Sequence, residues 1–229
     1  LKKMKKVTLL VLSLVSLTIA TAKEKKLTIN DIEPKLAGKL VGQNVEFKKV
    51  KYMVVGKESY DDFFFTSAKL NGLGKLSRAM TKASTKQLKK YAMSKAADET
   101  MKENIKELIG ESEPDKLSTE QSFAIMKMSK KRKQLTKDEL NYFKNTIIAL
   151  LIVTESLKNG VGEVGQLTKD GKKLIKGIKK AKLKLKQIIP TTKGLNSSIK
   201  NLTKFGKNTP KVLEEIAVLV KGFQMLSSA

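Results

Sequence analysis

The chain has 229 residues, of which 47 are Lys or Arg and 22 are Asp or Glu, so its net charge at pH 7 is +25. It contains no His and no Cys, which excludes disulfides, catalysis by an imidazole or a thiolate, and most zinc, copper and haem sites. We therefore expect no enzyme, no cofactor and no bound metal, and a fold held together by packing alone.

The first residues, LKKMKKVTLLVLSLVSLTIATA, have the three parts of a secretory signal peptide. Lysines precede an apolar run from Val7 to Ile19, and Ala20-Thr21-Ala22 is a small-residue cleavage site. The run is shorter than the ~20 residues of a membrane-spanning helix. We expect residues 1–22 to be removed and the remainder to be exported to the periplasm, the outer envelope or the medium. Whether translation starts at Leu1 or Met4 is left open.

Residues 23–56 form a mixed segment in which Pro34, Gly38 and Gly42 keep any helix short. The stretch VEFKKVKYMVV is rich in β-branched and aromatic residues. It predicts at most one short strand near residues 45–55, with a helix or an extended stretch along the bundle as alternatives. No second segment has a clear strand pattern that would offer a partner.

Residues 57–229 have the pattern of a helical bundle. The first part contains FFF at 63–65, and three consecutive Phe residues cannot all face one way on a helix. We predict a packed junction between helices there, with an apolar partner or lipid as the alternative. Apolar residues three and four apart then predict a helix from 76 to 109.

Two capping boxes mark the starts of the next helices. Ser118 is followed three positions later by Gln121, and Thr136 by Glu139. In such pairs the hydroxyl of the first residue accepts from the backbone N–H three positions later. The Gln or Glu side chain in turn accepts from the backbone N–H of the first residue. Further on, Gly206 is predicted to end one helix and Thr209-Pro210 to start the last one.

Residues 140–189 carry the most regular pattern. Positions at alternating steps of three and four, through 143, 147, 150, 154, 157 and 161 as far as 185 and 189, are mostly apolar: eleven of the fifteen hold a large apolar residue. Pro190 is predicted to end the repeat. This spacing is typical of a coiled-coil seam. It fits either one bent helix over 137–189 or a hairpin that turns at Asn159-Gly160. The sequence therefore predicts a mainly α fold, an elongated helical bundle or hairpin with long coiled-coil-like helices.

GVGEVG at 160–165 matches the glycine spacing of a dinucleotide-binding loop. Such a loop directly follows a strand, and an acidic residue comes ~20 positions later. Here TESLKN continues the helical register before Gly160, and no acidic residue closes a second strand at that distance. We interpret the glycines as a weak point or bend in the helices, not as a nucleotide site.

Two kinds of side chain are candidates for contact with a partner. The apolar candidates for a membrane or partner contact are Ile147, Ile148, Leu150, Leu151, Ile152, Val153, Phe63, Phe64 and Phe65. The basic candidates for a polyanion contact are Lys130, Lys131, Arg132, Lys133, Lys179, Lys180, Lys182 and Lys184. Nucleic acid is not expected, because only two residues are Arg and few aromatic residues are present for base stacking.

The leading hypothesis is an exported, non-enzymatic helical-bundle protein of the bacterial envelope that acts by binding or as a structural component. One alternative is a membrane-active, pore-forming-like protein in which residues 147–153 or the basic amphipathic stretch 177–189 meet lipid. The second alternative is a polyanion binder. A protein or envelope component, an anionic membrane surface and a second copy of the chain all stay open as partners.

Overall fold

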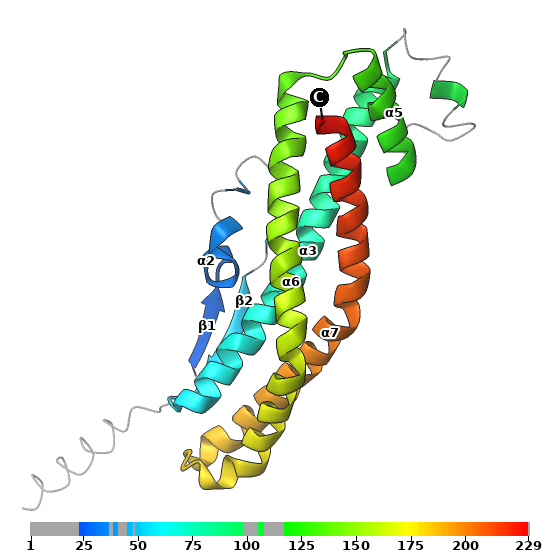
Figure 1. Cartoon of the computed structure of the whole chain (residues 1–229). Helices are drawn as coiled ribbons and strands as arrows, with labels where there is room; N and C mark the ends of the chain where they lie inside the picture. Colours follow the sequence, from blue (N-terminus) through cyan, green and yellow to red (C-terminus); the bar gives the residue numbers. More distant parts are fainter. Residues whose placement is uncertain are drawn as a thin grey trace, which may run out of the picture.

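The computed structural model describes residues 23–36, 39–40, 45–47, 49–98, 105–107 and 117–228. The predicted signal peptide, and most of the predicted helix beyond residue 98, lie outside these ranges. Three long helices dominate the described part: α3 (Glu58–Ala96), α6 (Lys137–Gly177) and α7 (Leu185–Ser227). They lie side by side in an elongated bundle, with the shorter α5 (Thr119–Lys131) near one end (Figure 1). The predicted mainly α bundle is confirmed.

A small antiparallel sheet precedes the bundle. Strand β2 (Val50–Val54) lies in the predicted region, but it pairs with a second strand, β1 (Lys23–Leu27), in the register Lys23 to Val54 and Leu27 to Val50. The prediction of at most one strand was therefore wrong. β1 reads KEKKL, and only Leu27 is buried, so the strand has no apolar alternation that a sequence pattern would reveal. Backbone pairing with β2 decides its conformation.

Two short elements follow β1, the helix α2 (Ile29–Ile32) and the 3₁₀ turn η1 (Pro34–Leu36). α2 and the sheet pack on α3, and η1 contacts α2 and α6. Ile32 and Leu36 are fully buried in these contacts. The N-terminal segment is therefore part of the same apolar core as the helices.

α5 and α6 begin at the predicted capping boxes. Ser118 Oγ accepts from the Gln121 N–H at 3.1 Å, and Thr136 Oγ1 accepts from the Glu139 N–H at 3.2 Å. The longer side chains accept in return from the backbone N–H groups of the capping residues, at 2.8 and 2.7 Å. Both predictions are confirmed. A capping box joins residues only three positions apart, so it does not depend on the tertiary structure around it.

α6 runs unbroken through GVGEVG, and the chain reverses near residues 178–184 instead. The 3₁₀ turn η4 (Ile178–Lys180) follows Gly177, and Lys182 then takes a left-handed conformation with φ +53°. Both alternatives for residues 137–189 were therefore wrong: the chain does not turn at Asn159-Gly160, and it is not one helix as far as residue 189.

α7 contains the residues that were predicted to break it. Pro190, Gly206 and Pro210 all lie inside one helix of 43 residues. An interior proline costs about 3 kcal/mol because it removes one hydrogen bond and crowds the preceding turn. α7 is bent rather than straight in Figure 1, as prolines are expected to make it. Its packing along α6 and α3 offsets this cost.

The apolar seam of α6 follows the predicted period but is shifted at every second position. Phe143, Leu150 and Leu157 are buried as predicted. The alternate positions are Thr146, Val153 and Gly160 rather than 147, 154 and 161, and Val161 is 37% exposed. Both sets of positions, 146, 153 and 160 or 147, 154 and 161, fit a 3.5-residue repeat. Only the packing of α3 and α7 around α6 decides which set is buried.

Phenyl rings lie directly on glycines where the long helices meet. Phe63 of α3 lies on Gly171 of α6, and Phe64 lies on Gly194 of α7. A Cβ atom on Gly171 would lie 2.7 Å from Phe63 Cζ and 2.9 Å from Ile199 Cγ1. The prediction that FFF marks a packed helix junction is confirmed for Phe63 and Phe64.

A close contact of the same kind explains why the first residue of GVGEVG is glycine. Gly160 is buried, and a Cβ atom there would lie 2.8 Å from Leu70 Cδ2 and 3.2 Å from Phe205 Cζ. Phe205 also lies on Gly74 of α3. Gly162 and Gly165 have open space around them. Within this motif, close packing requires glycine only at position 160.

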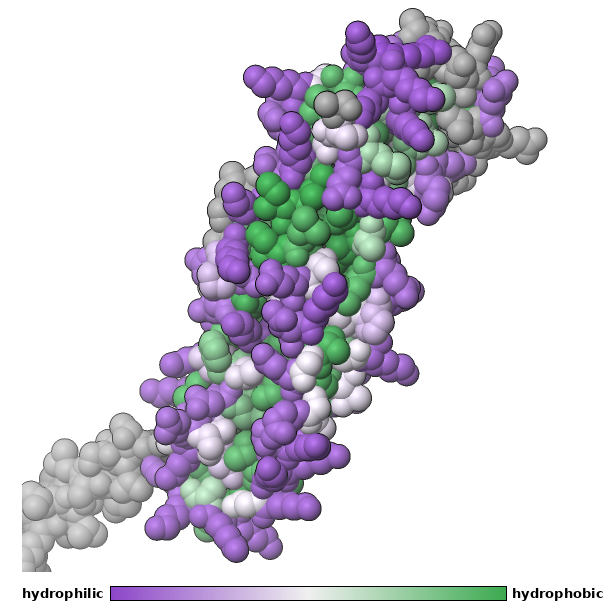
Figure 2. Space-filling model, in the orientation of Figure 1, coloured by the Kyte–Doolittle hydropathy of each residue, from purple (hydrophilic) through white to green (hydrophobic). Residues whose placement is uncertain are grey.

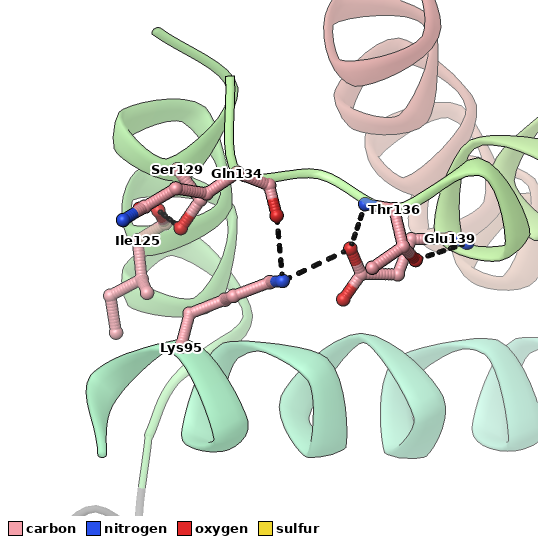
Figure 3. Close-up of polar contacts among 6 residues, drawn as sticks. All are labelled: Lys95, Ile125, Ser129, Gln134, Thr136 and Glu139. Atoms are coloured by element: carbon pink, nitrogen blue, oxygen red, sulfur yellow. Dashed lines mark hydrogen bonds and ion pairs between the residues drawn. The ribbon is translucent and has the colours of Figure 1, made fainter. Parts of the chain in front are cut away.

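A buried ion pair joins α3 to the start of α6 (Figure 3). Lys95 Nζ lies 3.2 Å from Glu139 Oε2 and donates to the Gln134 carbonyl at 2.8 Å. The two charged side chains are 16% and 8% exposed. Because Glu139 also caps α6 through the Thr136 N–H, one carboxylate fixes both the helix start and its position on α3.

We expect Gly171→Ala to lower the free energy of unfolding by about 1–2 kcal/mol, because overpacking at Phe63 and Ile199 outweighs the gain in helix propensity. The matched control is Gly162→Ala on the same helix. It should raise the free energy of unfolding by up to about 1 kcal/mol, because no atom lies near its Cβ. Urea unfolding measures both. Equal effects of the two substitutions would contradict the close packing at Gly171.

Lys95→Met should destabilise the protein by about 3 kcal/mol, because it leaves the Glu139 carboxylate buried without its cation. Lys95→Met combined with Glu139→Gln should recover part of that loss. The control is Lys51→Met, which removes a pair with Glu24 whose side chains are both more than half exposed. It should change stability by less than about 1 kcal/mol. Thermal and urea unfolding would test all three variants.

Candidate functional site

The apolar run at 147–153 is divided between the core and the surface. Leu150 and Val153 are fully buried, and Ile147 and Ile152 are partly buried. Ile148 and Leu151 are 44% and 48% exposed. Figure 2 shows a hydrophobic area over the upper parts of α6 and α7, on the face seen in Figure 1. Of the six candidate contacts in this run, Ile148 and Leu151 are the most exposed.

The three phenylalanines are divided in the same way. Phe63 and Phe64 lie in the core, whereas Phe65 is exposed and meets Tyr52 of β2 edge-on, with ring centroids 5.6 Å apart. Of these three phenylalanines, Phe65 is the one that a membrane or a partner could contact in the folded bundle.

Lys130, the first lysine of KKRK, caps the C-terminus of α7. Lys130 Nζ donates to the Met225 carbonyl at 2.9 Å, and also to the carbonyl and hydroxyl of Ser228. Met225 lies in the last turn of α7 and Ser228 is the residue that caps it, at the end where a cation complements the helix dipole. Lys131, Arg132 and Lys133 lie exposed in and after the last turn of α5. Lys130 therefore has a structural role that the charge run did not predict.

The other four basic candidates lie together at the turn between α6 and α7. We call residues 178–189 the hairpin tip, and it forms the end of the bundle drawn lowest in Figure 1. Lys179, Lys180, Lys182 and Lys184 are all exposed there. Leu185 and Ile189 are 87% and 66% exposed, more than any other large apolar residue that the structure describes. Four residues apart on one helix, they share a face.

The prediction for Leu185 and Ile189 was wrong, because both were placed in the buried seam. The repeat of apolar residues continues through the turn, but the helix that carried it ends at Gly177. Ile178 and Gln187 are buried at the tip instead. The alternation KLKLK was the available signal that lysines and apolar residues share one exposed surface.

The segment that forms the hairpin tip and the first part of α7 carries charge of one sign, whereas Asp62 of α3 and Asp170 line a pocket with Gly177 at the base of the tip. From Gly171 to Leu213 the chain has 13 lysines and no Asp or Glu. Asp170, just before this stretch, pairs with Lys173 at 3.6 Å. A surface of this kind has a positive potential that attracts anions from a distance and weakens with salt.

A hydrogen bond from α3 fixes the end of α6 next to the tip. Tyr60 Oη donates to the Leu174 carbonyl at 3.0 Å, and burial raises the pKa of the Tyr60 hydroxyl. The hydroxyl therefore keeps its proton and remains a donor at neutral pH. The tip extends from a part of α6 that is held on α3.

None of the helices in the described part has the length and apolarity needed to cross a membrane. The described residues also contain no group of three or more acidic side chains placed to hold a metal ion. Comparison with family models, with curated proteins and with solved structures finds no match to this chain. Its function is therefore argued from its own residues.

The two neighbouring lysines of KKRK should behave differently when substituted. We expect Lys130→Met to lower the free energy of unfolding by about 1 kcal/mol, because the last carbonyls of α7 lose their donor. Lys131→Met should change it by less than about 0.5 kcal/mol, as a surface substitution. Thermal unfolding measures both, and equal effects would contradict the capping role of Lys130.

Proposed function

We propose that this chain is an exported, non-enzymatic helical-bundle protein of the bacterial envelope that acts by binding, and that its hairpin tip docks on anionic lipid surfaces. The observation that carries the proposal is the exposure of Leu185 and Ile189, at 87% and 66%, among lysines at the end of the bundle. The N-terminal pattern supports export, and the lack of His and Cys supports binding rather than catalysis.

The tip combines two interactions that a bilayer surface offers together. Burying a large aliphatic side chain contributes about 1.5–3 kcal/mol, and each lysine near an anionic leaflet contributes about 1 kcal/mol. Lysine stems pass along apolar surface while their ammonium groups stay with the lipid headgroups. Two aliphatic side chains and several lysines are thus enough for reversible docking.

The apolar residues favour lipid over a dissolved polyanion. Heparin-like chains would bind the lysines but would leave Leu185 and Ile189 in water. Lipid acyl chains remove both side chains from water while the phosphates neutralise Lys179, Lys180 and Lys182. The second alternative, polyanion binding, therefore accounts for the charge of the tip and not for its exposed apolar surface.

Vesicle co-sedimentation tests this proposal. The protein should bind vesicles that contain phosphatidylglycerol, bind phosphatidylcholine vesicles much less, and keep part of its binding in high salt. Leu185→Ser with Ile189→Ser should weaken binding at least tenfold, which corresponds to about 1.4 kcal/mol. The matched control, Ile148→Ser with Leu151→Ser, removes two exposed apolar residues away from the tip and should bind as the unchanged protein does.

Three outcomes would contradict docking by the tip. The first is no binding to anionic vesicles, and the second is binding that the Leu185 and Ile189 substitutions leave unchanged. The third is binding lost in the Ile148 and Leu151 variant, which would transfer the contact to the α6–α7 surface. Circular dichroism of each variant would show that the bundle is intact.

A further inference from the structure

An exposed apolar area lies on the upper parts of α6 and α7, away from the hairpin tip (Figure 2). Apart from two residues of the tip, the four most exposed large apolar residues that the structure describes all lie there. They are Val218, Leu151, Met225 and Ile148, at 51%, 48%, 46% and 44%. Ala217, next to Val218, is also exposed. We call the exposed surface of Ile148, Leu151, Ala217 and Val218 the α6–α7 surface.

Two ring contacts place the two parts of this surface side by side. Phe143 of α6 stacks on Phe223 of α7 with ring centroids 5.3 Å apart, and Phe205 of α7 lies on Gly160 of α6. Between these contacts the two helices run in opposite directions. The apolar pair of each helix lies between the same two contacts, so the two pairs are level with each other to within about one helical turn.

On α6 the apolar pair is flanked by opposite charges. Lys144 comes four residues before Ile148, and Glu155 comes four residues after Leu151. The four side chains follow the spacing i, i+4, i+7, i+11, so they form one line along the helix, and all are exposed. A twofold axis through the centre of this line exchanges the two apolar residues, and it also exchanges the lysine with the glutamate.

α7 has a matching arrangement at the same level. Glu214 comes three residues before Ala217, Lys221 comes three residues after Val218, and both charged residues are exposed. Because α7 runs antiparallel to α6, both lysines lie at the upper end of the surface and both glutamates lie at its lower end. The α6–α7 surface is therefore positive at one end, negative at the other and apolar between.

These four charged side chains have no ion-pair partner in the described part of the chain. The chain as a whole has a net charge of +25, so two copies repel each other in general. The α6–α7 surface is an exception, because its two lysines are balanced by two glutamates. An anionic lipid surface, in contrast, would be repelled by the glutamates. This surface therefore favours a partner with the same distribution of charge, which a second copy of the chain supplies.

We propose that two copies of this chain pair through the α6–α7 surface about a twofold axis perpendicular to α6, so that their helices run antiparallel. Ile148 of each copy contacts Leu151 of the other, and Lys144 of each copy pairs with Glu155 of the other. Lys221 pairs with Glu214 in the same way. A twofold axis parallel to the helices would instead bring lysine to lysine and glutamate to glutamate.

The charges around the surface are compatible with this pairing. The exposed residues Lys158 and Lys211 come to the level of Asn141 and Gln224 of the second copy. The two hairpin tips lie at opposite ends of the dimer, roughly 80 Å apart at 1.5 Å per residue of helix. A vesicle surface meets only one tip of each dimer, so the pairing and the docking of the tip are independent of each other.

Sedimentation velocity of the protein at increasing concentration tests the pairing. The unchanged protein should form a dimer at micromolar concentrations. Ile148→Ser with Leu151→Ser should weaken the dimer at least tenfold, which corresponds to about 1.4 kcal/mol. Leu185→Ser with Ile189→Ser removes the exposed apolar residues of the tip and should leave the dimer unchanged. That control separates this proposal from docking by the tip.

A charge exchange tests the antiparallel register. Lys144→Glu should weaken the dimer at least tenfold, because it sets a glutamate against Glu155 twice in each dimer. Adding Glu155→Lys to this variant should restore the affinity, since opposite charges then meet again. Lys172→Glu, at an exposed lysine further along α6, changes the net charge equally and should have no effect.

Crosslinking locates the axis, because the chain has no Cys and an introduced thiol is unique. A short bismaleimide should join two copies of the Ala217→Cys variant, whose thiol lies next to the axis, but not two copies of Lys180→Cys. The proposal is overturned if the protein is monomeric up to about 100 µM, or if Ile148→Ser with Leu151→Ser leaves the dimer unchanged. It is also overturned if the charge exchange fails to restore the dimer, or if Lys180→Cys crosslinks as readily as Ala217→Cys.

Discussion

Direct contact between phenyl rings and glycines is the constraint on which the rest of this structure depends. Phe63 on Gly171 joins α3 to α6, Phe64 on Gly194 joins α3 to α7, and Phe205 reaches Gly74 and Gly160 on the other two long helices. A ring can approach a helix backbone this closely only where no Cβ is present. Each such glycine weakens its own helix by about 1 kcal/mol. Burying a whole aromatic side chain against that glycine stabilises the fold by more than the glycine costs its helix.

These contacts also place the hairpin tip, which we connect with function. Phe64 on Gly194 fixes α7 on α3. Phe63 on Gly171 holds α6 just before its end, and the chain then turns away from the core. The tip can therefore be strongly basic and partly apolar without disturbing the packing that supports it.

Local features of the fold could be predicted from the sequence, and features that depend on distant neighbours could not. The capping boxes at Ser118 and Thr136 were predicted correctly because both partners lie within one turn. The break predicted at Pro190 was wrong because contacts of α7 with α6 and α3 outweigh the local cost of proline. β1 was missed because its charged residues become a strand only by pairing with β2. At the hairpin tip, the lysines and the amphipathic character of residues 177–189 were found from the sequence, whereas the seam pattern wrongly placed Leu185 and Ile189 in the core.

The sequence by itself determined the class of fold, the period of the apolar seam, the starts of α5 and α6 and the excess of positive charge, since each of these is a property of composition or of neighbours along the chain. Tertiary structure alone decided which of two adjacent positions in α6 faces the core, that α6 ends at Gly177, and that Leu185 and Ile189 face water. The physical reason is that a helix has polar and apolar faces from its own residues, but only the helices packed around it determine which face is covered.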